Sequence, residues 1–156
     1  MKIDFRTAER KDVDLVRRFF QKGSLNYKGY GVWLPKAIEE FYYGTKEVIL
    51  GFSEDLLVSA LMFQDCKNLK GFKELKSGRT IKEFSRRFFL SFMIRQVEEI
   101  SRQEGRLGII SDARSTRKDV INLLKGNGYR EIARADLYRE GYEDVILTKV
   151  ISNSFD

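Results

Sequence analysis

The stretch LKSGRTIKEFSRRFFLSF, residues 75–92, carries a glycine, hydroxyl side chains and basic residues ahead of a strongly apolar segment. Backbone amides and the dipole at a helix N-terminus attract anions, and nearby basic side chains strengthen that attraction. One interpretation is therefore a phosphate cradle. The other is the polar entrance to a core helix, with surface arginines beside core aromatics.

The start of that helix decides which residues would face a phosphate. Thr80 with Glu83 matches a capping box, which would start the helix early. The apolar face of residues 89–100 does not extend back cleanly, because Lys82, Ser85 and Arg86 occupy it in the preceding turns. We expect a break within residues 85–87, with a fourth strand over 72–79 and a crossing over 80–84.

Several kinds of chemistry are disfavoured by composition. The 156 residues contain no histidine and one cysteine, Cys66. Histidine is the commonest metal ligand and the usual base that activates a serine or cysteine nucleophile. We therefore predict no metal site, no catalytic triad and no internal disulfide.

Length, charge and hydropathy indicate one compact domain over residues 1–151, with a frayed tail over 152–156. The net charge of +6 favours anionic partners. No apolar run is long enough to span a bilayer, and the first twelve residues lack the apolar core of a signal peptide. We expect a cytoplasmic protein that does not bind membranes.

Hydrophobic periodicity predicts alternating strands and helices. Val16, Phe19 and Phe20 share one helical face, and Gly44, Gly105 and Gly141 mark ends or turns. Strands are expected at 2–8, 47–53, 55–64, 72–79, 106–113, 130–140 and 142–151. Helices are expected at 12–23, 34–44, 88–104 and 115–128, with a loop over 23–35. The fold class is α/β, or α+β by stricter naming, with a single mixed, mostly antiparallel central sheet flanked by helices.

This order resembles the GNAT superfamily of acyl-CoA-dependent N-acyltransferases, over nearly the whole chain. RTAERKD resembles the family's opening Arg-x-Ala and helix-starting Asp, EVILGFSEDLLVSALMF its second and third strands, DVINLLKGNGYREI its last helix and Gly-aromatic turn, and GYEDVILTKVI its closing strand. The resemblance implies a sheet that splays between its fourth and fifth strands. It also implies transfer of an acetyl group from acetyl-CoA to a primary amine of a small molecule or peptide.

In this family the cofactor pyrophosphate lies on backbone amides at the start of the helix after the fourth strand. The matching positions are Ser85, Arg86, Arg87, Phe88, Phe89 and Leu90. Phe88 and Leu90 replace the small residues that let a phosphate approach the backbone, so the site is expected to be altered. Arg117 and Lys118 are candidates for contacts with the pantetheine or phosphate end.

The family's catalytic positions are only partly filled. Its proton-donating Tyr and preceding Asn correspond to Leu124 and Arg117. A carboxylate can accept the amine's proton, and Glu74 on the fourth strand is our candidate. Asp112 follows the fifth strand, where it could instead begin a loop or cap a helix. Aromatic residues at 27, 30 and 33 are expected in a loop that would overhang the acceptor.

Two other functions remain open. One is a CoA-binding or regulatory module that kept the fold and lost turnover, which the missing Tyr, Asn and Gly would explain. The other, less favoured, is nucleic-acid binding, because SRRFF interleaves arginine and aromatic residues. An exposed sheet edge or the aromatic loop could form a homodimer.

Overall fold

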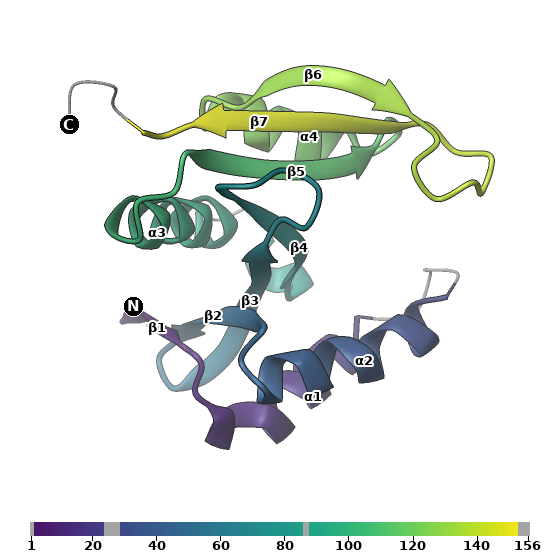
Figure 1. Ribbon diagram of the computed structural model, residues 1–156. Coiled ribbons are helices and arrows are strands. Elements are labelled where there is room, and N and C mark those ends of the chain that lie inside the picture. The colour runs from purple at the N-terminus through teal and green to yellow at the C-terminus, as the bar shows by residue number, and fades with distance from the viewer. Residues whose placement is uncertain (1, 24–28, 86–87, 153–156) are drawn as a thin grey trace. The chain divides into compact units, whose positions relative to one another are not determined.

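The computed structural model describes residues 2–23, 29–85 and 88–152 (Figure 1). Seven strands follow the order β1-β2-β3-β4-β5-β7-β6 in one mixed, mostly antiparallel sheet. The chain divides into two compact units, which we call the first unit (residues 1–64 and 76–94) and the second unit (residues 65–75 and 95–156). Three elements, β3, β4 and α3, contribute residues to both.

The first unit begins with an antiparallel meander. Strands β1 (Ile3–Thr7), β2 (Lys46–Ser53) and β3 (Leu56–Asp65) pair in sequence order, which confirms the predicted hairpin between β2 and β3. Helices α1 (Val13–Gln21) and α2 (Tyr30–Tyr42) pack side by side (Figure 1). Their apolar faces share a core with one face of the meander, which includes Val16, Phe20, Leu34, Phe41, Val48, Leu50 and Met62.

Helix α2 corrects two expectations. It starts at Tyr30 after its N-cap Gly29, which has a φ of 80°, so Pro35 lies inside the helix rather than near its first turn. Tyr30 and Trp33 are therefore helical, not loop residues, and both pack against the core of the first unit. That packing overrides the helix-breaking tendency of Pro35 and Gly31. Residue 27 lies outside the described residues.

The segment after β4 confirms the predicted break. Strand β4 spans Phe72–Thr80, a 3-10 helix spans Lys82–Phe84, and α3 runs from Phe89 to Gln103. The early start at a Thr80–Glu83 capping box is wrong, because the Thr80 hydroxyl lies 2.8 Å from the Ser59 hydroxyl instead. Gly105, with a φ of 73°, follows the end of α3 as expected.

The second unit contains the rest of the sheet. The first residues of β4 pair in parallel with β5 (Gly108–Arg114), which pairs with β7 (Asp144–Val150), and β7 pairs with β6 (Arg130–Ala135). Helix α4 (Lys118–Gly126) precedes β6. Ile109, Val145 and Leu147 are fully buried on one face, where α3 supplies Glu98 to bond Lys149.

The fold class is as expected, a mixed sheet with flanking helices. No helix within the described ranges is both long enough and apolar enough to cross a bilayer. Of the tail, only Ser152 is described. The single domain over 1–151 stays a prediction.

Candidate functional site

Glu74 lies where the ladder between β4 and β5 ends. The parallel register joins Phe72 to Gly108, Lys73 to Ile109 and Glu74 to Ile110, whereas β5 continues to Arg114. Alternation along a strand points Lys73 and Glu74 to opposite faces. The half-buried Glu74 thus marks the last paired position of the second unit's parallel ladder.

Lys73 fixes this end of β4. Its ammonium, with a side chain only 4% exposed, lies 3.1 Å from an Asp65 carboxylate oxygen and 3.0 Å from one of Glu104. Arg106 makes a further ion pair with Asp65 at 3.1 Å. These charged pairs tie β4 to the loop that enters β5, and so hold its neighbour Glu74 in place.

Asp112 lies inside β5, not in the loop after it. It neither begins a loop nor caps a helix, because β5 runs to Arg114 and the N-cap of α4 is Arg117. The Tyr138 hydroxyl donates a hydrogen bond of 3.0 Å to Asp112 Oδ2. Two residues that are distant in the sequence, on a strand and in a loop, therefore meet on the second unit.

The loop that carries Tyr138 is itself tied down. Asp136 accepts hydrogen bonds from the backbone N–H groups of Glu140, at 3.1 Å, and Gly141, at 2.9 Å. Arg114 of β5 donates to Glu140 at 3.2 Å, and its guanidinium carbon lies 4.2 Å from the centre of the Tyr142 ring. The loop between β6 and β7 is thus anchored to the end of β5.

Negative charge gathers around this phenol. Burial raises the pKa of the Tyr138 hydroxyl, and the charges of Asp112, Glu74 and Asp144 raise it further. Burial also raises the pKa of Asp144, with a further contribution from Asp112. Perturbed carboxylates of this kind are typical of functional sites. Within residues 2–23, 29–85 and 88–152, no group of His, Cys, Asp or Glu side chains suits a metal ion.

The six residues matched to the pyrophosphate loop differ in environment. Ser85 is exposed and its hydroxyl donates to the Lys82 carbonyl at 2.9 Å, while Arg86 and Arg87 lie outside the described residues. Phe88 is 43% exposed, whereas Phe89 is fully buried. Phe88 and Phe89 stack with ring centres 5.6 Å apart, in an aromatic cluster that also includes Phe5, Phe84 and Phe92.

Glycines elsewhere make room for the bulky residues of this segment. A Cβ built on Gly51 of β2 would lie 3.2 Å from the Phe89 ring, and one on Gly78 of β4 would lie 3.2 Å from Leu90 Cδ1. The absence of a side chain at Gly78 on β4 thus leaves room for the side chain of Leu90. The first turn of α3 keeps its helical form, with Phe92 N–H bonding Phe88 C=O at 3.0 Å.

That first turn remains chemically suited to an anion. The amides of the opening residues of any α-helix lack acceptors four residues earlier and point out of the helix end. Together with the helix dipole they form a binding place for phosphate. The backbone of Phe89 and Leu90 belongs to this turn even though the Phe89 side chain is a core residue.

The other predicted cofactor residues lie at the start of α4. Arg117, the N-cap, donates two hydrogen bonds to Asp119, at 3.1 and 3.2 Å, and this pairing lowers the pKa of Asp119. Lys118 is exposed at the first helical position. Leu124 is 2% exposed and belongs to the core of the second unit, so it contributes no polar group.

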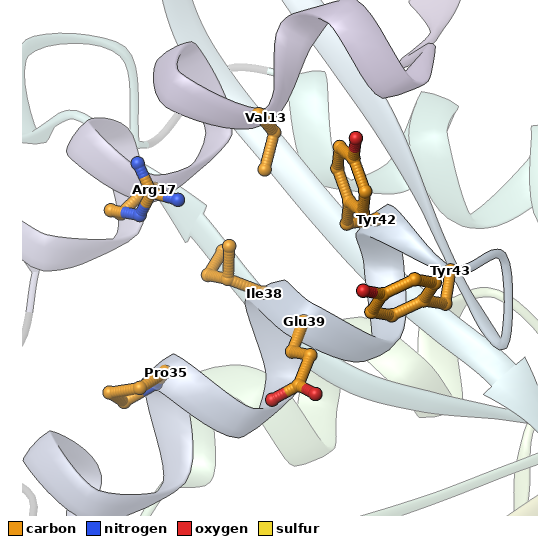
Figure 2. A pocket seen from close by; sticks show the side chains of 7 residues that line it. All are labelled: Val13, Arg17, Pro35, Ile38, Glu39, Tyr42 and Tyr43. Atoms are coloured by element: carbon orange, nitrogen blue, oxygen red, sulfur yellow. The ribbon is translucent and has the colours of Figure 1, made fainter.

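A pocket in the first unit was not predicted from the sequence. It has a volume of about 400 Å³ and lies between α1 and α2 (Figure 2), where it is lined by Val13, Arg17, Pro35, Ile38, Glu39, Tyr42 and Tyr43. Val13, Ile38 and Pro35 form an apolar part, with the two tyrosines to one side (Figure 2). Arg17 is paired with Asp14. The pocket is large enough for a small molecule but holds none of the predicted site residues.

Comparison with solved structures gives consistent matches. A proposed GNAT-family acetyltransferase from Desulfovibrio desulfuricans superposes with a TM-score of 0.82 at 14% identity, covering 97% of this chain and 100% of that one. A proposed acetyltransferase from Salmonella typhimurium, solved with its cofactor acetyl-CoA, gives 0.80 at 11% identity and covers 98% and 96%. A spermidine/spermine N-acetyltransferase from Vibrio cholerae gives 0.70 at 10% identity and covers 96% and 95%.

This chain has the GNAT fold. No family model and no curated protein matches the sequence itself. In this GNAT fold the structure brings Glu74 into the neighbourhood of Asp112, Tyr138 and Asp144, and it keeps the Ser85–Leu90 positions in the first unit. Sequence reasoning missed Tyr138 and Asp144, although their place on either side of the Gly141 turn was a signal that they return to the end of β5.

Proposed function

We propose that the protein is a cytoplasmic N-acyltransferase that transfers an acetyl group from acetyl-CoA to a primary amine of a small molecule or peptide. The observation that carries the proposal is the half-buried Glu74 at the end of the β4–β5 ladder of a GNAT fold. Residues 1–151 would act as one acyltransferase domain. The Salmonella neighbour with acetyl-CoA and the Vibrio neighbour named for a polyamine support the donor and the acceptor class.

In the proposed reaction the neutral amine attacks the thioester carbonyl directly. The new C–N bond forms and the C–S bond breaks, which releases CoA thiolate. Glu74 accepts a proton from the attacking nitrogen, directly or through water. Leu124 cannot protonate the thiolate, so that proton comes from solvent or from the protonated base. Coenzyme A thiolate is a fair leaving group, and the loss of the usual acid would slow transfer without abolishing it.

The proposed cofactor contacts lie on two helix starts. The backbone of Ser85 to Leu90 would hold the pyrophosphate at α3, with Arg86 and Arg87 adding charge. Arg117 and Lys118 would contact the pantetheine or phosphate end at α4. Gly78 supports this assignment, because the room it gives Leu90 lets a bulky residue replace a small one.

Thermal unfolding with acetyl-CoA or CoA tests the donor site first. A ligand at about 100 times its dissociation constant stabilises the folded state by roughly 2.7 kcal/mol. We expect either ligand to raise the unfolding temperature. The absence of a shift at millimolar concentrations would contradict cofactor binding.

Turnover is then tested by release of CoA thiol in the presence of spermidine or a lysine-containing peptide. Glu74→Gln should lower kcat by about 100-fold or more. Glu99→Gln is the matched control, because Glu99 is an exposed carboxylate on α3 that pairs only at the surface with Arg102. Equal activity of the two variants would exclude Glu74 as the base.

A second candidate function is a CoA-binding module without turnover. It is favoured by Leu124, which replaces the family's phenol with a buried aliphatic side chain. Stabilisation by CoA without thiol release for any amine would support it. Nucleic-acid binding is not proposed, because Phe89 is fully buried and Phe88 is then the one exposed aromatic side chain of SRRFF, too few for a stacking surface.

A further inference from the structure

We infer that Tyr138 is a positioning residue for the transfer, and that it orients Asp112 as a second proton acceptor beside Glu74. This inference rests on the proposed function and deepens it. It assigns roles to a loop residue and a β5 carboxylate that the position of Glu74 alone does not require.

The sheet register places the two carboxylates on one face. Glu74 is opposite Ile110, and Asp112 follows Ile110 by two residues on β5, so the side chains of Glu74 and Asp112 point the same way. Two residues along β5 add roughly 6.6 Å and the step between strands adds about 4.8 Å, so the two positions lie roughly 8 Å apart on one face. An amine that lies across this face would have a carboxylate on either side of it.

Tyr138 joins this pair from the loop between β6 and β7. Its hydroxyl donates to Asp112 Oδ2 at 3.0 Å, and Glu74 is close enough to act on the same hydroxyl electrostatically. The phenol stays protonated because burial and the surrounding carboxylates raise its pKa. It is therefore a donor throughout the physiological range, and its proton is directed at Asp112.

Because the Tyr138 hydroxyl donates its proton to Asp112, its role is to position that carboxylate and not to act as the acid of the reaction. A hydrogen bond to a carboxylate favours the ionised form and fixes the plane of the group. The hydroxyl of Tyr138 thus holds Asp112 as a base, instead of supplying the proton that Leu124 cannot give. Loop anchoring by Asp136 and Arg114 makes the orientation rigid.

The charged groups around Asp112 come from every neighbouring segment. Glu74 faces it from β4, Asp144 from β7 and Tyr138 from the loop, while Arg114 lies two residues along β5. Arg114 lowers the pKa of Asp144, and Asp136 raises it. Among these groups, the Tyr138 hydroxyl donates a hydrogen bond to Asp112.

Two acceptors in sequence satisfy the proton balance of the reaction. An amine enters as R–NH₃⁺ and leaves as an amide with one N–H, so two protons depart. Asp112 takes the first, which passes to water, and generates the nucleophilic amine. Glu74 takes the second as the C–N bond forms, and the thiolate released by C–S cleavage gains one proton to give CoA.

The test compares Tyr138→Phe with Tyr142→Phe. Both remove one phenol oxygen from the same loop, and the ring of Tyr142, which packs against Arg114, is kept. With acetyl-CoA and an amine accepted by the wild type, Tyr138→Phe should lower kcat/KM about tenfold at neutral pH and move the acidic limb of the pH profile upward. Tyr142→Phe should stay within about twofold.

Asp112→Asn should lower kcat/KM about 100-fold, and adding Tyr138→Phe to it should change little more, because the two act as a unit. Acetyl-CoA should raise the unfolding temperature of every variant as it does that of the wild type. Tyr138→Phe with wild-type activity and pH profile would overturn the inference.

A second measurement does not depend on turnover. In a carbon-13 NMR titration, the midpoint of the Asp112 carboxyl signal should move to higher pH in Tyr138→Phe and stay unchanged in Tyr142→Phe. An unmoved titration overturns the positioning role even if the enzyme is active. A moved titration in a protein that binds acetyl-CoA but transfers to no amine overturns the proposed function, and with it any role of Tyr138 in transfer.

Discussion

Two buried aspartates, one in each unit, have opposite electrostatic environments. Asp12 in the first unit accepts bidentate hydrogen bonds from Arg6, at 2.7 and 2.9 Å, and a third from the Glu9 backbone at 2.8 Å. The bonds from Arg6 lower its pKa to about 2. Burial raises the pKa of Asp144 in the second unit, and the charges of Asp112 and Asp136 raise it further.

The difference contrasts a carboxylate that is paired with a cation with one that lies among other carboxylates. Asp12 has its opposite charge and donors in place, so its ionised form stabilises the start of α1. Asp144 is buried near the like charges of Asp112 and Asp136, which the Leu137 backbone and Arg114 only partly offset. Natural proteins tolerate such local costs mainly at functional sites, where stability is lost in exchange for activity. The contrast therefore supports a site around Asp112, Tyr138 and Asp144.

The largest expected effect is that of removing Glu98, a buried acid of the second unit that has hydrogen-bonding partners. It tests whether such an acid stabilises the fold, in contrast to Asp144. Glu98, with a side chain 4% exposed, accepts hydrogen bonds from the Tyr129 hydroxyl at 3.0 Å and from Lys149 at 2.8 Å. Glu98→Ala leaves Lys149 without this partner and should cost about 3 to 5 kcal/mol of unfolding free energy in urea.

Glu99→Ala provides the control for that measurement. Glu99 is the adjacent residue on α3, with a side chain 61% exposed, and it pairs with Arg102 at 3.5 Å. Its loss should cost less than about 1 kcal/mol. If Glu98→Ala lost as little unfolding free energy as Glu99→Ala, hydrogen-bonding partners would not explain whether a buried acid of the second unit stabilises the fold.

Asp12→Asn should have the next largest effect, a loss of about 2 kcal/mol at pH 7. The folded pKa of Asp12, about 2, lies below its ordinary value of 3.8, so its contribution is complete above that value and is lost as pH falls through about 2. Urea unfolding at pH 7, 4 and 2.5 should show the gap between wild type and variant narrowing.

Asp14→Asn separates this effect from a general loss of charge in α1. Asp14 has a side chain 69% exposed and pairs with Arg17 one turn along the helix. A change of less than about 1 kcal/mol is expected. A gap for Asp12→Asn that stayed constant down to pH 2.5 would contradict the pairing with Arg6 as its cause.

Much of the fold could be predicted from the sequence because its signals are local. Alternating and helical periodicities located most strands and the α-helices, although β6 ends at Ala135 rather than at residue 140. Gly105 and Gly141, with φ of 73° and 81°, were correctly placed at a helix end and a turn. The helix phase also predicted the break before Phe89. The start of α2 was wrong because its decisive contacts, from Tyr30 and Trp33 to the core, are tertiary.

The candidate site was harder to predict for the same reason. The hydrogen bond between Tyr138 and Asp112 joins residues 26 positions apart, and only the pairing of β5 with β7 brings them together. The contact in which Gly78 leaves room for Leu90 likewise depends on how a strand packs against a helix. The family resemblance, applied to the fourth strand, identified Glu74 as a candidate, but it could not identify the partners around it.

The smallest expected effect has the opposite sign to that at Asp12. Because the folded pKa of Asp144 is raised above its ordinary value of 3.8, ionisation opposes folding, and wild-type stability falls as pH rises through the interval between the two values. Asp144→Asn removes that charge. Its amide oxygen can still accept the backbone hydrogen bond from Leu137.

Asp144→Asn should therefore be more stable than the wild type at pH 7, by less than the loss at Asp12, and should lose this advantage near pH 3. Urea unfolding at the two pH values measures both. A variant destabilised at pH 7, as Asp12→Asn is expected to be, would make Asp144 another structural carboxylate. If Asp144→Asn were instead more stable and transferred acetyl groups more slowly, the negative charge of Asp144 would lower stability while supporting the proposed reaction.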